Sequence, residues 1–391
     1  MRKIDDLIQE LCPEGVEYRE LQLIGKRNHG TSITATQMKG IHKVGGEVRI
    51  FAGGNTIADV SLNDIPLKDI IWEPSIIVKS RGYIDFVYYD RPFSHKNELW
   101  SYTINIESVN QKFVYYYLIT HKERLQEVAR ATSVKIPQLS VADTDNLSVP
   151  LPPLPIQEEI VRILDKFTKL EAELEAELEA RKKQYEYYRN QLLSPIEKDG
   201  KWYMNGNETA NCKLSDLARI TTGKLNANAM EADGLYPYFT CAEMPYRINK
   251  YAFDTEAILI SGNGSQVGHI NHYCGKFNAY QRTYVLYKFA GGVTVQYLFH
   301  YFKAHLKSYI MTNVKEGSVP YITLPMLKSF QIPIPSLSEQ ERIVSILSRF
   351  DALVNDIAIG LPAEIAARRK QYEYYRGKLL SFKNIADRAE A

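Results

Sequence analysis

Cysteine is scarce in this sequence, and long apolar runs are absent. Only 4 cysteines occur among 391 residues, and none forms a Cys-x-x-Cys pair. A disulfide framework and a structural zinc site are therefore disfavoured, and we expect reduced thiols. No apolar run approaches the roughly 18 residues that a membrane-spanning helix needs, and residues 1–10 are polar and charged rather than signal-like. These features predict a cytoplasmic protein without a membrane partner.

An excess of charge of either sign is also absent. The chain has 48 Lys and Arg against 46 Asp and Glu, which gives a formal net charge of +2. A non-specific nucleic-acid coat is strongly basic, so any nucleic-acid surface on this chain must be local. With 391 residues, of which 45% are hydrophobic, the chain is expected to form a globular protein of two to four domains.

Motifs for catalysis and cofactor binding are missing. The chain has no Gly-x-x-x-x-Gly-Lys-Ser/Thr sequence for ATP and no Asn-Pro-Pro-Tyr/Phe tetrapeptide of the kind that amino-methyltransferases use. The Gly-rich stretch 262–268 is one residue off a dinucleotide-binding spacing, and residues 269–273 after it look like a strand rather than a helix. His269, His272 and Cys274 lack two further metal ligands at plausible spacing. We therefore expect no catalytic residues, no metal and no cofactor on this chain.

An internal repeat organises the sequence. The heptapeptide Lys-Gln-Tyr-Glu-Tyr-Tyr-Arg occurs at 183–189 and again at 370–376, which is 187 residues later. Upstream the two copies match at an offset of 183, so that the Gln-Glu pair at 157–158 recurs at 340–341. The second copy therefore carries four more residues than the first, near 360–362. Four residues are close to one turn of an α-helix.

Each copy of the repeat predicts a long helix. Apolar residues step by three and four through residues 151–194 and 334–391, which is typical of a coiled-coil seam. Gly360 and Pro362 favour a break or kink in the second helix, because proline removes a backbone hydrogen bond. The seam would suit a zipper between two chains, but we expect the two copies to pack on each other within one chain. Their relative direction stays open.

Two blocks of similar size precede the helices, in residues 1–150 and 195–333. Both contain short β-type runs between glycine, asparagine and proline turns, and each has an amphipathic helix candidate, near 110–129 and near 293–312. The sequence therefore predicts two α+β domains. The expected strands include residues 70–72, 75–78, 83–89, 257–260 and 283–287.

The two blocks resemble each other loosely. Ile-Phe-Ala-Gly at 50–53 matches Tyr-Phe-Thr-Cys at 238–241, Phe93 matches Phe277, and the strand before Gly82 matches the strand before Gly264. A frame that recurs while its loops differ is expected of a duplicated scaffold whose loops recognise different ligands.

The loops of both blocks are polar and partly basic. Arg, Lys, Asn and Gln are the side chains that read base edges and bind phosphates, because they carry several or bidentate hydrogen-bonding groups. The alternative is that these residues form ordinary solvated turns. The candidate DNA-binding residues are Arg27, Asn28, Lys79, Arg81, Lys96, Asn97, Lys224, Asn226, Asn263, Ser265, Gln266, Gln281 and Arg282.

The chain resembles the specificity subunits of type I restriction-modification systems. The resemblance extends from Cys-Pro-Glu-Gly-Val-Glu-Tyr-Arg-Glu-Leu at 12–21, through both Gln-Glu helix starts, to residues 368–382. It implies an α+β fold with two tandem target-recognition domains of similar fold, 1–150 and 195–333. It also implies two long conserved helices, 151–194 and 334–391, that form an intramolecular antiparallel coiled coil. One departure is that the first helix is four residues shorter than the second, so the resemblance assigns no spacer length.

The resemblance also implies a function and partners. Such a chain would be a non-catalytic reader of double-stranded DNA, with one half of a bipartite, asymmetric site bound by each domain and the helices setting the spacer. Two modification subunits would bind the chain and methylate adenine N6 with S-adenosylmethionine, and restriction subunits that use ATP and Mg would join them. The competing hypothesis is a coiled-coil adaptor that holds two ligand-binding domains and does not bind DNA.

Overall fold

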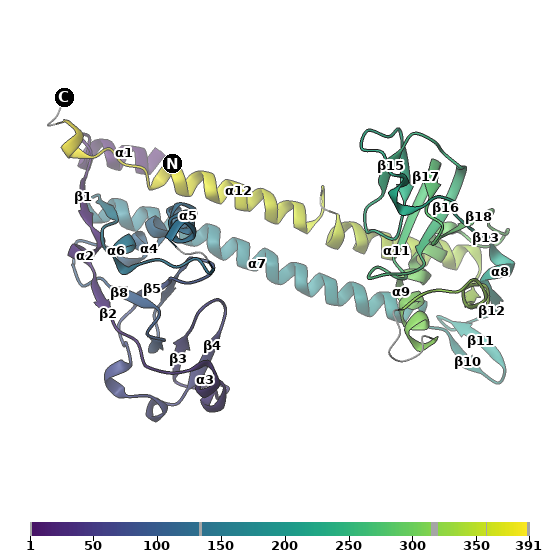
Figure 1. Cartoon of the computed structure of the whole chain (residues 1–391), viewed down its shortest axis with the longest axis horizontal. Coiled ribbons are helices and arrows are strands. Elements are labelled where there is room, and N and C mark those ends of the chain that lie inside the picture. The colour runs from purple at the N-terminus through teal and green to yellow at the C-terminus, as the bar shows by residue number, and fades with distance from the viewer. Residues whose placement is uncertain (1, 133–134, 314–319, 357, 389–391) are drawn as a thin grey trace. The chain divides into compact units, whose positions relative to one another are not determined.

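The structure divides into two compact units. It is a computed structural model, and it describes residues 2–132, 135–313, 320–356 and 358–388. Unit 1 comprises Met1–Glu173 with Ile365–Ala391, and unit 2 comprises Leu174–Glu364 (Figure 1). Each unit therefore combines one of the two β-rich blocks with parts of both copies of the helical repeat.

Unit 1 contains three small sheets. Its four-stranded antiparallel sheet has the order β2 (Lys26–Asn28), β8 (Trp100–Thr103), β5 (Ser75–Lys79) and β6 (Asp85–Tyr89). A three-stranded sheet has the order β4 (Ile57–Val60), β3 (Val48–Phe51) and β7 (Phe93–His95), and β3 and β7 run parallel. In the third sheet, β1 (Glu17–Glu20) pairs with β9 (Ser148–Leu151).

Apart from the repeat helices, the described residues of unit 1 form α1 (Arg2–Leu11), α2 (Leu21–Ile24), α3 (Ala35–Ile41), α4 (Gln111–Thr120), α5 (Lys122–Thr132) and α6 (Val141–Asp145), with 3-10 turns at Leu62–Asp64, Leu67–Asp69 and Ile385–Arg388. α3 packs in a smaller core through Met38, and the other five helices pack on the largest apolar core of unit 1. Ile76, Phe113 and Ile160 are all buried in this core. They come from β5, α4 and the start of the first repeat helix, so the domain and the helix share one core.

Unit 2 contains a six-stranded and a four-stranded sheet. The first has the order β13 (Arg219–Thr222), β18 (Thr283–Tyr287), β16 (Phe253–Ser261), β17 (Ile270–Ala279), β14 (Tyr236–Phe239) and β15 (Tyr246–Ile248). The second has the order β10 (Ile196–Lys198), β11 (Lys201–Met204), β12 (Asn207–Lys213) and β19 (Gln331–Ile334). Apart from the repeat helices, its described residues form the helices α8 (Leu214–Leu217), α9 (Val295–Asn313) and α10 (Leu324–Lys328), with a 3-10 turn at Ala227–Ala229.

The two domains share one frame. Phe51 of β3 lies opposite His95 of β7 in a parallel pair, and Phe239 of β14 lies opposite Ala279 of β17 in the same way. A Cβ atom on Gly30 would lie 1.8 Å from the carbonyl oxygen of His95, and one on Gly223 would lie 1.8 Å from that of Ala279. The expected recurrence of the scaffold is thus confirmed, down to a glycine that each copy needs for the close approach of two backbones.

The frames differ at one strand. In unit 2, the ten residues of β17 pair with β16 along most of their length and with β14 at their end. In unit 1 the corresponding chain is interrupted at residues 90–92, between β6 and β7. Pro92 has no backbone N–H to donate to a neighbouring strand, which explains why the sheet divides there.

Two expectations about single elements were wrong. Residues 110–129 form two helices, α4 and α5, because the chain turns at His121. Residues 70–72 form no strand, and only Ile71 makes an isolated bridge, to Phe93. The preceding 3-10 turn at Leu67–Asp69 ends at Ile70 and leaves too few residues for a ladder.

The second copy of the repeat contains the break that Gly360 and Pro362 favour, so it does not form one long helix. The first copy forms one continuous helix of 40 residues, α7 (Leu154–Leu193), but the second forms two, α11 (Leu337–Asn355) and α12 (Leu361–Leu379) (Figure 1). The break coincides with Gly360 and with Pro362 in the first turn of α12. The Asp356 carboxylate accepts hydrogen bonds from the backbone N–H groups of Ala358 and Ile359, at 2.7 and 3.2 Å. The four additional residues of the second copy therefore lie at this break and do not lengthen a helix.

Within each unit, aromatic residues of one repeat copy pack on the other copy. In unit 1 the ring of Phe167 lies 6.1 Å from that of Tyr372 and 5.7 Å from that of Tyr375. In unit 2 the ring of Tyr188 stacks on that of Phe350 at 5.5 Å. Two of the three tyrosines in each heptapeptide therefore pack against the other copy, whereas Tyr187 and Tyr374 are exposed.

A buried glutamine joins each domain to its helix. The Gln157 amide accepts a hydrogen bond from the Asn110 N–H at 2.8 Å and donates to the carbonyl oxygens of Ser108 and Pro152 at 3.0 and 2.6 Å. Gln340 makes the equivalent three bonds, with the Thr294 N–H and the carbonyl oxygens of Gly292 and Pro335, at 2.8, 2.8 and 2.9 Å. Both side chains are fully buried. The repeated glutamine therefore satisfies three backbone groups at each junction of domain and helix.

Replacing Gln157 by leucine tests this role. The substitution Gln157→Leu keeps the approximate volume but leaves one N–H and two carbonyl groups without partners, so we expect the free energy of unfolding to fall by about 3 to 5 kcal/mol. Denaturant unfolding of the full chain measures this change. The exposed neighbour Glu158 provides the control, because Glu158→Ala is expected to change the unfolding free energy by less than about 0.5 kcal/mol.

Candidate nucleic-acid interface

Loops from several strands of unit 2 meet at one end of its six-stranded sheet. Leu225 and Tyr280 form a parallel bridge, and the Tyr280 N–H donates to the Phe239 carbonyl at 2.9 Å. The Gly262 N–H donates to the carbonyl of Arg282, also at 2.9 Å. These backbone bonds bring together the chain after β13, β14 and β16 and the chain before β18.

A small hollow lies among these loops. Its volume is about 240 Å³, and it is lined by Thr222, Gly262, Asn263, Gln281, Arg282, Tyr284, Tyr321 and Ile322. Three of the residues predicted to contact DNA, Asn263, Gln281 and Arg282, therefore share one site. Arg282 is exposed, and it has no ion pair with any residue in the part of the chain that the structure describes.

Asn263 is held in place from two sides. Its backbone forms an isolated bridge with Tyr321, and its Oδ1 accepts a hydrogen bond from the Cys241 thiol at 3.1 Å. The same sulfur lies 3.6 Å from the carbonyl oxygen of Arg282. The shorter of the two contacts favours an orientation of the Asn263 amide in which Oδ1 faces the thiol.

The other residues of unit 2 that were predicted to contact DNA are close to lining residues in the sequence but do not line the hollow. Lys224, Asn226, Ser265 and Gln266 are all exposed. The backbone carbonyl of Asn226 accepts a hydrogen bond from the Tyr238 hydroxyl at 2.6 Å, which anchors its loop to the sheet.

Unit 1 builds an equivalent end from different residues. Arg81 bridges Gln138 as Asn263 bridges Tyr321, and the Lys96 N–H donates to the Phe51 carbonyl as that of Tyr280 does to Phe239. Arg81 is exposed, and so is Asn97, which follows Lys96 as Gln281 follows Tyr280.

Two lysines predicted to contact DNA already have partners in unit 1. Lys96 forms an ion pair with Glu98 at 2.9 Å, and the Lys79 ammonium donates to the Gly54 carbonyl at 2.8 Å. A DNA contact by either lysine would have to share or replace these bonds.

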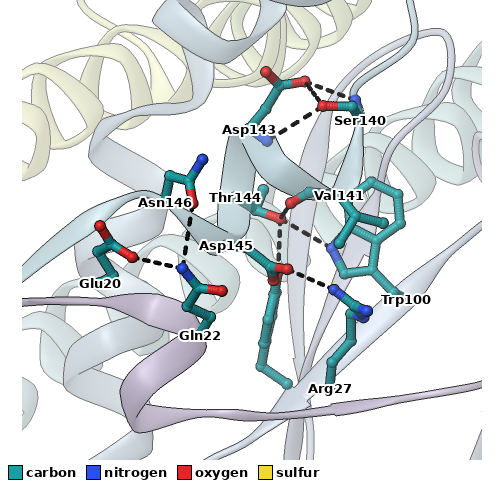
Figure 2. A network of polar contacts seen from close by, with 11 residues as sticks. Glu20, Gln22, Arg27, Trp100, Ser140, Val141, Asp143, Thr144, Asp145 and Asn146 are labelled. Carbon is teal, nitrogen blue, oxygen red and sulfur yellow. Dashed lines mark hydrogen bonds and ion pairs between the residues drawn. The ribbon is translucent and has the colours of Figure 1, made fainter.

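Arg27 belongs to a polar network that joins α6 to the sheet (Figure 2). Its guanidinium donates to Asp145 at 2.5 Å, and the Tyr102 hydroxyl donates to the other carboxylate oxygen at 2.5 Å. Thr144 accepts from the Trp100 indole N–H at 3.0 Å and lies 2.7 Å from the Tyr102 hydroxyl. Burial and the Asp145 carboxylate raise the pKa of Tyr102, so this phenol stays protonated and remains a donor.

Asn28 is also engaged inside unit 1. Its Nδ2 donates to the hydroxyl oxygens of Ser101 and Thr103, at 3.2 and 2.7 Å, across the pair of β2 with β8. The side chains of Arg27 and Asn28 therefore make contacts that stabilise the domain. In unit 1, the exposed residues Arg81 and Asn97 are the stronger candidates for DNA contact.

Five residues that line the hollow were not predicted from the sequence: Thr222, Gly262, Tyr284, Tyr321 and Ile322. Cys241, which contacts Asn263 but does not line the hollow, was not predicted either. A signal for Tyr321 was present, because Pro320 is the duplicate of Pro137, and Gln138 and Tyr321 directly follow these prolines. Cys241 had no such signal, because its match in the first block is Gly53 and its role depends on the loop geometry.

The structure can also be examined for metal sites and for helices that could span a membrane. Among the described residues, there is no group of three or more His, Cys, Asp or Glu side chains placed to hold a metal ion. His272 instead lies 2.9 Å from the carboxylate of Glu256 on the adjacent strand. No helix within the described ranges is both long and apolar enough to cross a membrane.

The fold is thus a duplicated α+β domain joined to a duplicated helix, with a polar loop cluster on each domain. A family model described as the type I restriction modification DNA specificity domain matches the chain twice, at residues 13–180 and 207–367. The chain belongs to this family.

Individual relatives agree with this assignment. The chain is 35% identical over 296 residues to the EcoR124I/EcoR124II specificity subunit of Escherichia coli, which covers 69% of this chain and 70% of that one. It is 32% identical over 302 residues to a putative type I restriction enzyme specificity subunit of Haemophilus influenzae, with 71% and 73% covered.

Solved structures share the fold. The S subunit of a type I restriction-modification system from M. genitalium superimposes with a TM-score of 0.64 at 17% identity, covering 94% of this chain and 96% of that one. A chain from a structural study of assembly of the type I restriction-modification system gives a TM-score of 0.56 at 16% identity, with 95% and 98% covered. At these identities the likeness shows the fold alone.

The network around Asp145 can be tested by removing the hydroxyl of Tyr102. Tyr102→Phe takes one donor from a largely buried carboxylate, so we expect the unfolding free energy to fall by about 1.5 to 3 kcal/mol. The matched control is Tyr187→Phe in α7, because Tyr187 is 62% exposed. Equal unfolding midpoints for the two variants would contradict the structural role of the network.

Proposed function

We propose that this chain reads a bipartite, asymmetric site on double-stranded DNA, with one half-site bound by the loop cluster of each domain. The observation that carries the proposal is the duplicated frame with different polar residues at the same end. Unit 1 places Arg81 and Asn97 where unit 2 places Asn263 and Gln281. Two copies of one frame with different hydrogen-bonding groups suit two different half-sites.

The chemistry of the loops supports this proposal. Arg, Asn and Gln present the donor and acceptor patterns that distinguish base pairs in the major groove, and Lys and Arg bind phosphates without regard to sequence. Family membership favours a DNA reader over an adaptor that does not bind DNA. The relatives are named as specificity subunits of restriction enzymes, which fits a role in recognition and not in catalysis.

We further propose that the repeat helices form an antiparallel coiled coil that sets the distance between the half-sites. Within unit 1, the contacts advance along α7 from Phe167 to Glu171 while they retreat along α12 from Tyr372 to Arg369, which forms an ion pair with Glu171 at 2.5 Å. The helices of unit 1 therefore run in opposite directions where they touch. The continuous α7 has residues in both units and would act as a spacer about 60 Å long.

The proposed partners are two modification subunits and, with them, restriction subunits. S-adenosylmethionine would then be bound by the modification subunits, and ATP and Mg by the restriction subunits. The sequence of this chain offers no Walker-type phosphate loop for ATP, which is consistent with such a division of roles.

Two exposed arginines, Arg81 and Arg282, provide the first test of DNA binding. If Arg81 contacts a phosphate, Arg81→Ala weakens binding to all sequences and reduces the slope of log affinity against log salt concentration by about 1. Titration of duplex DNA at several salt concentrations measures this slope. Arg27→Ala is the control, because Arg27 is paired with Asp145. Unchanged affinity and slope for both Arg81→Ala and Arg282→Ala would place both arginines outside the interface.

The spacer can be tested by changing the length of α7. Leu170, Leu174 and Leu178 lie four residues apart, so removing or adding four residues within 169–180 keeps the apolar positions in step. The helix changes by about 6 Å, the rise of one to two base pairs. We expect sequencing of methylated sites to show an altered spacer with the same half-sites. An unaltered spacer would show that the length of α7 does not set the distance between the half-sites.

A further inference from the structure

Two of the residues that line the hollow of unit 2, Asn263 and Arg282, carry hydrogen-bond donors. Because the Cys241 thiol occupies the Oδ1 side of the Asn263 amide, the Nδ2 group lies on the side away from the sulfur. Cys241 does not line the hollow, whereas Asn263 does. Arg282 adds a guanidinium at the same place, and this group can only donate hydrogen bonds.

A pair of donors selects among the base edges of the major groove. Adenine is normally read by an Asn or Gln that uses both its oxygen and its nitrogen, because adenine offers one acceptor and one donor. Guanine offers two acceptors, N7 and O6, and arginine is its commonest partner. The donors of Asn263 and Arg282 therefore match guanine better than any other base.

The corresponding position of unit 1 lacks this combination. Gly53 is two residues after Phe51, as Cys241 is two residues after Phe239, and Gly53 has no side chain to orient a neighbour. The counterpart of Arg282 is Glu98, which forms an ion pair with Lys96. The donor hollow is therefore specific to unit 2 and concerns only its half-site.

We propose that the hollow of unit 2 reads a guanine, with Asn263 and Arg282 donating to O6 and N7 and with Cys241 as a positioning residue for Asn263. The inference rests on the proposed function. It assigns to this half-site one base and the two side chains that select it.

The test is selection of bound sequences from a pool of randomised DNA duplexes. The full chain is used together with the modification subunits that copurify with it. For the wild type we expect an invariant guanine in one half-site, and for Asn263→Asp and Arg282→Ala we expect selection at that position to fall by about tenfold. The Asn263→Asp variant should instead favour cytosine, whose N4 group donates to a carboxylate. The matched control, Asn97→Asp, should affect only the other half-site.

Cys241 is tested by two substitutions. Cys241→Ser keeps a donor for Asn263 and should retain the selection of guanine, whereas Cys241→Ala should weaken it severalfold while affinity for non-specific DNA stays the same. If Cys241 had a purely structural role, Cys241→Ala would reduce the selection of guanine and the affinity for non-specific DNA together.

A modified base in the DNA tests the contact with the wild-type protein, so this result does not depend on whether a variant folds. Replacing the selected guanine by 7-deazaguanine removes N7 and should weaken wild-type binding about tenfold, but should not further weaken Arg282→Ala. If the variants change selection at a base other than guanine, or at none, this inference is wrong while the proposed function stands. If the wild-type complex selects no sequence, both are wrong.

Discussion

The buried glutamine at each junction of domain and helix is the interaction on which the rest of the structure depends. Gln157 and Gln340 each satisfy one backbone N–H and two carbonyl groups, where the chain leaves a domain and enters a helix of the repeat. A buried amide whose hydrogen bonds are all formed stabilises the junction and also fixes its geometry, because any displacement leaves buried polar groups without partners. The same junction occurs twice, so each domain is fixed to its helix in the same way.

A frame fixed in this manner leaves the loops at the far end of each sheet free to differ. Gly30 and Gly223 keep the backbones close at equivalent points, while the residues around them differ in charge and hydrogen-bonding capacity. Arg27 shows that a basic residue near these loops can instead belong to the frame, because its partner Asp145 also accepts from Tyr102. The side chains proposed for recognition are those that the frame does not use, above all Arg81, Asn97, Asn263, Gln281 and Arg282.

The architecture could be predicted from the sequence because the two copies of the repeat can be compared with each other. The heptapeptide and the Gln-Glu pairs located both helical copies, and Phe93 with Phe277 marked equivalent strands. The break between α11 and α12 was foreseen at Gly360 and Pro362, but the division of 110–129 at His121 was not, because no proline or glycine marks it. In the site, residue type pointed to Asn263, Gln281 and Arg282, whereas the roles of Cys241 and Tyr321 depend on loop contacts between residues far apart in the chain.

The most direct test of the account is the sequencing of methylated sites in cells that carry this chain with its modification subunits. If each domain reads one half-site, methylation depends on this chain and occurs at one asymmetric site with two specified parts separated by an unspecified gap. A single continuous site, or a pattern of methylation that is the same without the chain, would contradict this proposal.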